Sequence, residues 1–161
     1  MVTGEACGVT LVESLNLKSG MKTFDELSSA GPLQAVAGTL VLVVDDEAAV
    51  RRFAVRVLQR EGYAVIEAID GAEALELIKQ DSVSIDVVVS DIVMPRLNGV
   101  ELMQALAVSH PGLPVILMSG YATAALAELG IAAPCAIIAK PFVSDRLLEE
   151  VRRCARPRNV E

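Results

Sequence analysis

The sequence has no tryptophan, only 3% aromatic residues and a single histidine among its 161 residues. With so few aromatic side chains, a hydrophobic core must be built from Val, Leu, Ile and Ala, which suits a sheet that is covered on both faces. Basic residues are also in deficit, because 14 Lys and Arg stand against 21 Asp and Glu and give a net charge of −7. Nonspecific binding to nucleic acid or to an anionic membrane requires a positive surface, so we expect neither partner.

Cysteines are few and irregularly spaced. Cys7, Cys135 and Cys154 form no metal-ligand spacing, and their odd number argues against a disulfide framework. We therefore expect them to be small apolar fillers in a protein of the reducing, cytoplasmic compartment.

Long hydrophobic runs are absent as well. The longest uncharged segment of this kind, Leu102–Ala127, is broken by Pro111, Gly112 and Pro114. We expect two buried pieces and a turn there, not a transmembrane helix, and we expect no signal peptide.

What the sequence does have is 53% hydrophobic residues, enough for one folded domain. Residues 1–38 are rich in Gly, Ser and Thr and show no sustained period, so we interpret them as an extension or linker with a short helix at Thr23–Ala30. We expect the domain to span residues 39–157, and residues 158–161 to be a tail.

Short apolar runs alternate with helical periods from Thr39 onward. The runs predict five strands, at Leu40–Val44, Ala64–Ala68, Asp86–Ser90, Pro114–Met118 and Cys135–Ala139.

A helix is predicted after each strand. The first has Val50, Phe53, Ala54, Val57 and Leu58 on its apolar side, Arg51, Arg52, Arg56 and Arg60 on the other, and ends at Gly62. In the second, Asp70 and Glu73 form a start resembling a capping box, and Leu75 and Ile78 point inward. The remaining helices are predicted at Gly99–Ser109, Thr123–Leu129 and Ser144–Ala155.

Five such βα units predict a parallel sheet between two layers of helices, with right-handed crossovers. In sheets of this kind the ligand site lies beyond the carboxyl ends of the strands. Polar residues follow these strand ends, namely Asp45, Asp46, Asp91, Ser119 and Lys140. Each alone could simply terminate a strand, but together they indicate a site.

Three carboxylates in one place repel each other unless a cation joins them. Oxygen ligands favour Mg²⁺, which typically uses one or two carboxylates together with a phosphate. Lys140 and Ser119 would supply positive charge and a hydrogen-bond donor to that phosphate. Asp91 is then the predicted nucleophile, which forms an aspartyl phosphate.

The motifs VVDDE, SDIVMPRLNG, MSG and KPF, in this order, resemble the receiver domain of bacterial response regulators, the CheY-like family. The resemblance covers about Thr39 to Pro157. It implies an α/β doubly wound (βα)₅ fold of the flavodoxin and CheY type, with strand order 2-1-3-4-5.

The resemblance also implies roles for single residues. Asp91 matches the phosphoacceptor, and Asp45 and Asp46 match the acid pair that binds Mg²⁺, or Mn²⁺ in its place. Val93 matches the residue whose backbone carbonyl completes the metal site. The hydroxyl that moves toward the phosphoryl group is matched by Ser119, and the active-site amine is matched by Lys140, whose bond to Pro141 is expected to be cis.

A receiver domain implies a histidine kinase or a histidine phosphotransfer protein as partner. It is not an enzyme beyond its own Mg²⁺-dependent phosphorylation and dephosphorylation. The chain is expected to be either a single-domain regulator or the receiver of a hybrid sensor histidine kinase, and a monomer or weak dimer.

One position departs from the family pattern. The family usually has Tyr or Phe three residues before the lysine, where this chain has Ile137, and Tyr121 is not the equivalent position. Signalling through an aromatic rotamer is therefore not expected.

Two alternatives remain. A phosphohydrolase with an Asp nucleophile commonly has a second carboxylate two residues later, where this chain has Val93. An unphosphorylated pseudo-receiver, acting as a protein-interaction scaffold, usually loses an acid or the lysine, and this chain keeps them all.

Overall fold

The computed structural model describes residues 38–80, 83–120 and 133–155. These residues form one five-stranded parallel sheet in the order β2-β1-β3-β4-β5. The strands are β1 (Leu40–Val44), β2 (Ala64–Ala68), β3 (Val87–Asp91), β4 (Val115–Ser119) and β5 (Ala136–Ala139). The doubly wound α/β fold and its strand order are therefore confirmed.

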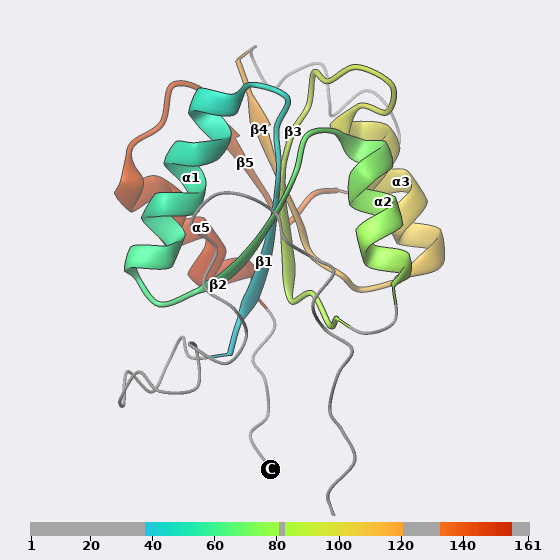
Figure 1. Cartoon of the computed structure of the whole chain (residues 1–161), viewed down its shortest axis with the longest axis horizontal. Coiled ribbons are helices and arrows are strands. Elements are labelled where there is room, and N and C mark those ends of the chain that lie inside the picture. Colours follow the sequence, from blue (N-terminus) through green and yellow to red (C-terminus); the bar gives the residue numbers. More distant parts are fainter. Residues whose placement is uncertain (1–37, 81–82, 121–132, 156–161) are drawn as a thin grey trace, which may run out of the picture. The chain divides into compact units, whose positions relative to one another are not determined.

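Four helices are described, and they cover the two faces of the sheet (Figure 1). Helices α1 (Ala48–Arg60) and α5 (Ser144–Cys154) lie on one face, and α2 (Gly71–Lys79) and α3 (Gly99–Ser109) lie on the other. The helix predicted at Thr123–Leu129 and the one at Thr23–Ala30 fall outside the described residues. None of the described helices is both long and apolar enough to cross a membrane.

Alternate residues of each strand face opposite layers, which is why the strands are mostly apolar. In β1, Val41 and Val43 belong to the core beneath α1 and α5, whereas Leu40, Leu42 and Val44 belong to the core beneath α2 and α3. All five residues of β1 are buried. Aliphatic side chains thus fill both cores, as the shortage of aromatic residues predicted.

Several predicted boundaries are wrong by one residue. The strand predicted from Asp86 begins at Val87. Asp86 pairs with Leu40 just before it, donating its N–H to the Leu40 carbonyl oxygen at 2.9 Å and accepting the Leu40 N–H on its carboxylate at 2.7 Å. β4 begins after Pro114, which lacks an N–H for the ladder. β5 starts after Cys135, and α5 ends at Cys154.

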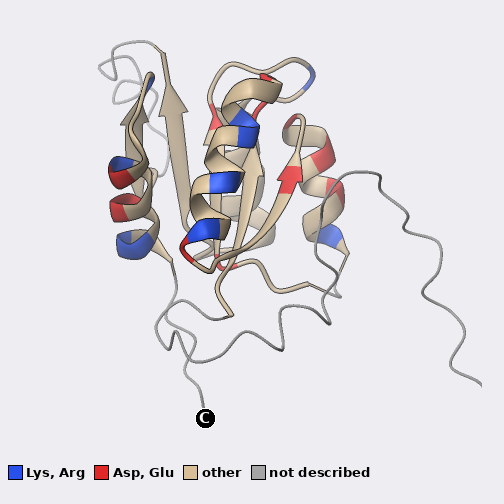
Figure 2. Cartoon of the chain, turned by 60° about the vertical axis from the view of Figure 1, so that its left-hand side comes forward, with Lys and Arg blue, Asp and Glu red and all other residues tan. Residues whose placement is uncertain are grey.

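Two side chains of α1 lie differently from the prediction. Phe53, predicted to face the core, is 41% exposed and packs its ring against Phe142 at 5.9 Å between centroids. Arg51, predicted on the solvent side, is largely buried and pairs with Glu67 at 3.1 Å. The helix still presents basic residues and no acid along its outer side (Figure 2).

The predicted role of two cysteines is also wrong. Cys135 and Cys154 are joined by a disulfide, with 6.0 Å between their Cα atoms. The odd number of cysteines gave no sign of this pair, because the partners are brought together only when α5 packs on the sheet beside β5. Cys7 lies outside the described residues.

Candidate functional site

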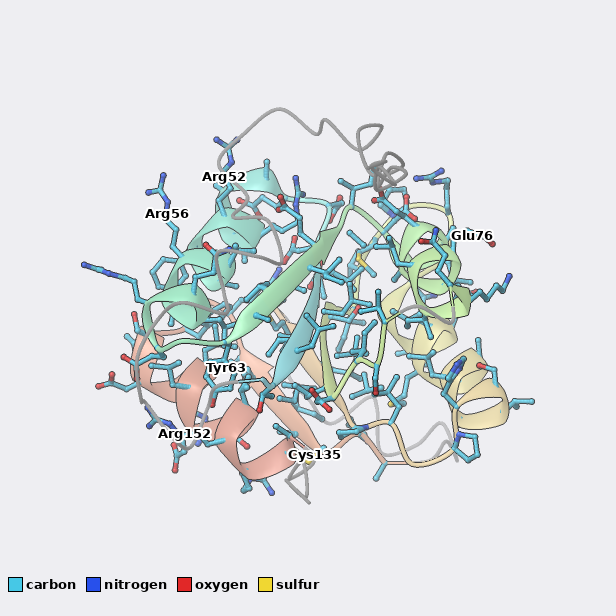
Figure 3. The ribbon with its side chains drawn as sticks, turned by 60° about the horizontal axis from the view of Figure 1, so that its bottom comes forward. Arg52, Arg56, Tyr63, Glu76, Cys135 and Arg152 are labelled. Atoms are coloured by element: carbon cyan, nitrogen blue, oxygen red, sulfur yellow. A yellow bond between two sulfur atoms is a disulfide. The ribbon has the colours of Figure 1, made fainter. Side chains whose placement is uncertain are left out.

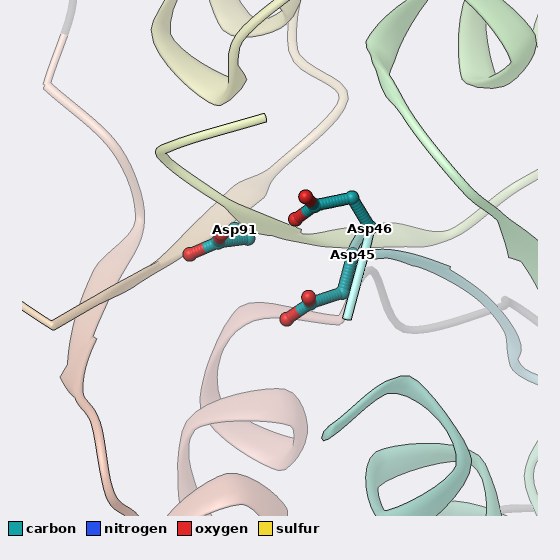
Figure 4. Close-up of side chains that lie close together, drawn as sticks. All are labelled: Asp45, Asp46 and Asp91. Atoms are coloured by element: carbon teal, nitrogen blue, oxygen red, sulfur yellow. The ribbon is translucent and has the colours of Figure 1, made fainter. Parts of the chain in front are cut away.

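The acidic side chains predicted as a cluster lie together at the carboxyl ends of β1 and β3. Asp45 and Asp46 directly follow β1, and Asp91 is the last residue of β3. One carboxylate oxygen from each lies within 4.8 Å of the others (Figure 4). Asp45 and Asp91 are buried, whereas Asp46 is exposed. The cluster therefore opens to solvent on the side of Asp46.

Lys140 reaches the same cluster from the end of β5. Its Nζ lies 2.7 Å from Asp45 Oδ2 and 3.1 Å from Asp91 Oδ1. The Lys140 N–H continues the sheet ladder by donating to the Ser119 carbonyl oxygen at 2.7 Å. The peptide bond between Lys140 and Pro141 is cis, as the resemblance implied. One ammonium thus bridges two carboxylates of the cluster.

Burial and neighbouring charges shift the pKa values of this pair. Burial raises the pKa of Asp91, the Lys140 ammonium opposes that rise, and the Asp45 carboxylate adds to it, so that the pKa of Asp91 lies above its ordinary value. Burial lowers the pKa of Lys140, but its hydrogen bonds to Asp45 and Asp91 outweigh burial and raise that pKa overall. The amine is therefore held in its charged form beside the acids.

The backbone around the acids is held from several directions. Asp45 Oδ1 accepts the Glu47 N–H at 2.8 Å, and the Arg51 guanidinium donates to the Asp45 carbonyl oxygen at 2.7 Å. The Ser90 hydroxyl donates to the Asp91 carbonyl oxygen at 2.9 Å. These bonds fix the positions from which the carboxylates project.

Helix α3 begins very close to Asp91. A Cβ atom placed on Gly99 would lie 2.1 Å from the Asp91 carbonyl oxygen, so only glycine allows this approach. The helix is fixed there by a capping box, in which the Asn98 side chain accepts the Glu101 N–H and the Glu101 side chain accepts the Asn98 N–H. Asn98 and Gly99, the NG of SDIVMPRLNG, therefore fix the start of α3 against Asp91.

The other two predicted residues also lie at this end of the sheet. Ser119 is the last residue of β4 and is buried. Val93 follows β3 by two residues and is 62% exposed. Ile137 is half-buried in β5, in register with Leu117. Tyr121 lies outside the described residues.

A second ion pair, which the sequence did not predict, lies at this rim. Asp70, which caps α2 by accepting the Glu73 N–H at 2.9 Å, is also paired with Arg96 in the loop after β3. Arg96 has a φ of 66°, and a Cβ on Gly71 would lie 2.6 Å from the Leu97 carbonyl oxygen. The start of α2 thus holds the loop that contains Val93. The signal in the sequence was only a capping pattern, which did not predict the partner of Asp70.

The donor set of the cluster fits a hard divalent cation. It consists of carboxylate oxygens, close enough together to share one ion and open to solvent on one side. Mg²⁺ prefers such oxygens and keeps several water ligands, for which the exposed Asp46 side leaves room. Asp45, Asp46 and Asp91 are therefore the residues that could hold it.

The sequence profile described as response regulator receiver domain matches residues 41–152, which include the three acids and Lys140. The chain belongs to this family. Receiver domains are signalling domains of two-component systems, and this membership agrees with the fold, the acid cluster and its lysine.

Among curated receiver-containing proteins, the sensor kinase CckA of Brucella abortus is 43% identical over 113 residues, which are 70% of this chain and 12% of CckA. The response regulator MprA of Mycobacterium ulcerans is 36% identical over 122 residues, which are 75% of this chain and 52% of MprA. The chain thus spans only part of these relatives.

Solved receiver structures agree. The receiver domain of the hybrid histidine kinase CckA has a TM-score of 0.60 at 34% identity, covering 73% of this chain and 99% of that one. The response regulator TrrA of Thermotoga maritima, in complex with Mg²⁺ and BeF, has a TM-score of 0.64 at 33% identity, covering 72% and 98%. The similarity therefore extends over nearly all of each compared receiver.

Proposed function

We propose that this receiver domain takes a phosphoryl group from a phosphohistidine onto Asp91, with a divalent cation held by Asp45, Asp46, Asp91 and the Val93 carbonyl. The donor is a histidine kinase or a histidine phosphotransfer protein. The single observation that supports this most strongly is the double contact of Lys140 with Asp45 and Asp91, because it puts a cation against the predicted nucleophile.

In the proposed reaction a carboxylate oxygen of Asp91 attacks phosphorus. The bond from phosphorus to the histidine nitrogen breaks, and its electron pair stays on the imidazole. Lys140 stabilises the negative charge of the transferred phosphoryl oxygens, and the Ser119 hydroxyl is the hydrogen-bond donor on the neighbouring strand. Mg²⁺, when bound, supplies further positive charge to those oxygens.

The phosphoacceptor role is favoured over a scaffold role, because a scaffold has no need of a buried acid cluster with a bridging amine. We infer that the domain works in the cytoplasm, where kinase domains have ATP, and that it acts as a monomer or weak dimer. With a net charge of −7, it would not bind nucleic acid by itself. It would serve either as a single-domain regulator or within a hybrid kinase.

The test is to incubate the protein with a small acyl phosphate and Mg²⁺ and to measure its intact mass. The unmodified chain should gain one phosphoryl group, and the gain should disappear with EDTA and in Asp91→Asn. Asp86→Asn is the matched control, since Asp86 is also buried but bonds to Leu40 away from the site, and this variant should still be phosphorylated. Equal phosphorylation of Asp91→Asn and the unmodified chain would refute the assignment.

A further inference from the structure

The disulfide between Cys135 and Cys154 has no part in the proposed phosphoryl transfer. Cys135, labelled in Figure 3, directly precedes β5. Lys140 follows the other end of that strand. Cys154 is the last residue of α5 and is buried in the core between α5 and the sheet. The disulfide therefore joins the amino-terminal end of β5 to the last turn of α5.

The chain between the two cysteines contains all of β5, then Lys140, and then α5. We name residues 135–154 the β5–α5 unit. Among the described residues β5 pairs with β4 alone, so one side of this strand lacks a described ladder partner. The disulfide joins residues 19 apart in the sequence, and the segment between them contains Lys140, whose ammonium contacts Asp91.

Noncovalent contacts also hold this unit. Leu147, Leu148 and Val151 of α5 are buried in the core, and the Arg153 guanidinium donates to the Cys135 carbonyl oxygen at 3.0 Å. Arg152 pairs with Glu61, which follows α1, at 2.9 Å. Because these contacts do not need the disulfide, the unit should stay folded when the disulfide is reduced, but it should open more often.

We propose that Cys135 and Cys154 are a reversible thiol–disulfide site, and that their redox state sets how often the β5–α5 unit opens. The inference is independent of the proposed phosphoryl transfer, because it concerns the cross-link and not the chemistry of Asp91.

The reaction partner is a low-molecular-weight disulfide. The Cys135 thiolate, which is the less buried of the two, attacks it and forms a mixed disulfide with release of one small thiol. The Cys154 thiolate then attacks the Cys135 sulfur, and a second small thiol leaves. The two cysteines lose two electrons and two protons in total, and the small disulfide gains them as two thiols. Excess small thiol reverses the exchange.

The test uses the full chain in a Cys7→Ala background, so that the third cysteine cannot exchange. The protein is equilibrated in glutathione buffers of graded ratio, free thiols are blocked with N-ethylmaleimide, and the peptides are mapped without reductant. A peptide pair joined through Cys135 and Cys154 should appear in oxidising buffer and disappear reversibly in reducing buffer.

Stability and hydrogen exchange report the effect on the unit. The oxidised form should melt roughly 5–15 °C higher than the reduced form, as expected for a chain closed into a loop of this length. Amide exchange in β5 and α5 should slow by at least tenfold on oxidation, whereas exchange in β1 and β2 should change less.

Cys135→Ser is the control variant, because this half-buried position tolerates a hydroxyl better than the buried Cys154 does. In this variant the melting temperature and the exchange of β5 and α5 should be the same in both buffers. Complete blocking of both thiols at every glutathione ratio would overturn the proposal, as would equal melting and exchange in the two states of the parent. Asp91→Asn should keep the redox response, so failure of phosphorylation and failure of this inference are distinguishable.

Discussion

Gly99 lies against the carbonyl oxygen of Asp91 so closely that a Cβ atom would come within 2.1 Å of it. Gly99→Ala must therefore push the start of α3 away from β3, and we expect it to lower the free energy of unfolding by about 1–3 kcal/mol. Urea denaturation measures the loss. Gly120→Ala is the control, since none of the residues that the structure describes lies within 4 Å of a Cβ there, and it should change stability by less than about 0.5 kcal/mol. Equal effects of the two substitutions would contradict the steric argument.

Lys140→Met separates the phosphoryl chemistry from cation binding. Without the ammonium the pKa of Asp91 should rise further, because Lys140 opposes the effect of burial. Mg²⁺ should bind at least as tightly as before, since a positive charge beside the acids is gone, while phosphorylation by an acyl phosphate should slow by tenfold or more. NMR titration of the Asp91 carboxyl group, Mg²⁺ titration and intact mass measure the three effects.

Lys79→Met is the matched control for that substitution. Lys79 is the last residue of α2, at the helix end opposite to Asp70, and pairs with Glu76 on the exposed side of the helix. Its loss should leave all three quantities unchanged. A large loss of Mg²⁺ affinity in Lys140→Met would show that the amine supports the cation site, contrary to the account.

Asp70 should make stability depend on pH. Burial raises the pKa of Asp70, but hydrogen bonds from the Glu73 N–H and from Arg96 outweigh burial and hold that pKa below its ordinary value of 3.8. A group with a lowered pKa in the folded state stabilises the fold above 3.8, and this contribution is lost as the pH falls through the folded-state pKa.

Two variants separate the effect of the Asp70 charge from the effect of its N-cap hydrogen bond. Asp70→Asn keeps an N-cap oxygen and removes only the charge, so it should cost less than about 1 kcal/mol at pH 7. Asp70→Ala removes the cap as well and should cost about 1–2 kcal/mol. The difference between the unmodified chain and Asp70→Asn should shrink below pH 4. Chemical denaturation across pH measures it, and a difference that stays constant down to pH 2 would exclude the charge of Asp70 as its source.

Ile137 bears on the response to phosphorylation. Isoleucine is stiff at χ1 and has no polar tip, so this half-buried side chain should favour the apolar interior in both states. If Ile137 takes the same position in the phosphorylated and unphosphorylated states, its interactions contribute little free energy to a change in the surface around β5 on phosphorylation. Sedimentation with and without a phosphoryl mimic and Mg²⁺ should therefore give the same monomeric species, and a clear shift to dimer would refute this expectation. Ile137→Tyr tests whether an aromatic residue restores a shift.

Much of the fold could be predicted because each strand contains a run of apolar residues and the helices show an amphipathic periodicity. The limits of β1, β2 and α3 were predicted to the residue, and the acids and Lys140 were placed at one end of the sheet. This worked because parallel strands place their carboxyl ends together whatever the details of packing. The Thr123–Leu129 helix is still a prediction.

What the sequence could not predict depends on packing between distant segments. The disulfide forms only when α5 packs beside β5. The Asp70–Arg96 pair forms only when the start of α2 lies beside the loop after β3. The contact between Phe53 and Phe142 forms only when α1 lies beside the segment that follows β5. These contacts join residues that are far apart in the sequence, so no helical or strand periodicity predicts them. They follow only from the positions of complete helices on the sheet.

A covalent phosphate at Asp91 is the central claim, and chemical trapping tests it most directly. The protein is treated with an acyl phosphate and Mg²⁺ and then with sodium borohydride, which reduces an aspartyl phosphate to homoserine, and its peptides are sequenced by mass spectrometry. The account predicts homoserine in place of Asp91 and at no other aspartate. Homoserine in place of Asp45 or Asp46, with Asp91 unchanged, would contradict it.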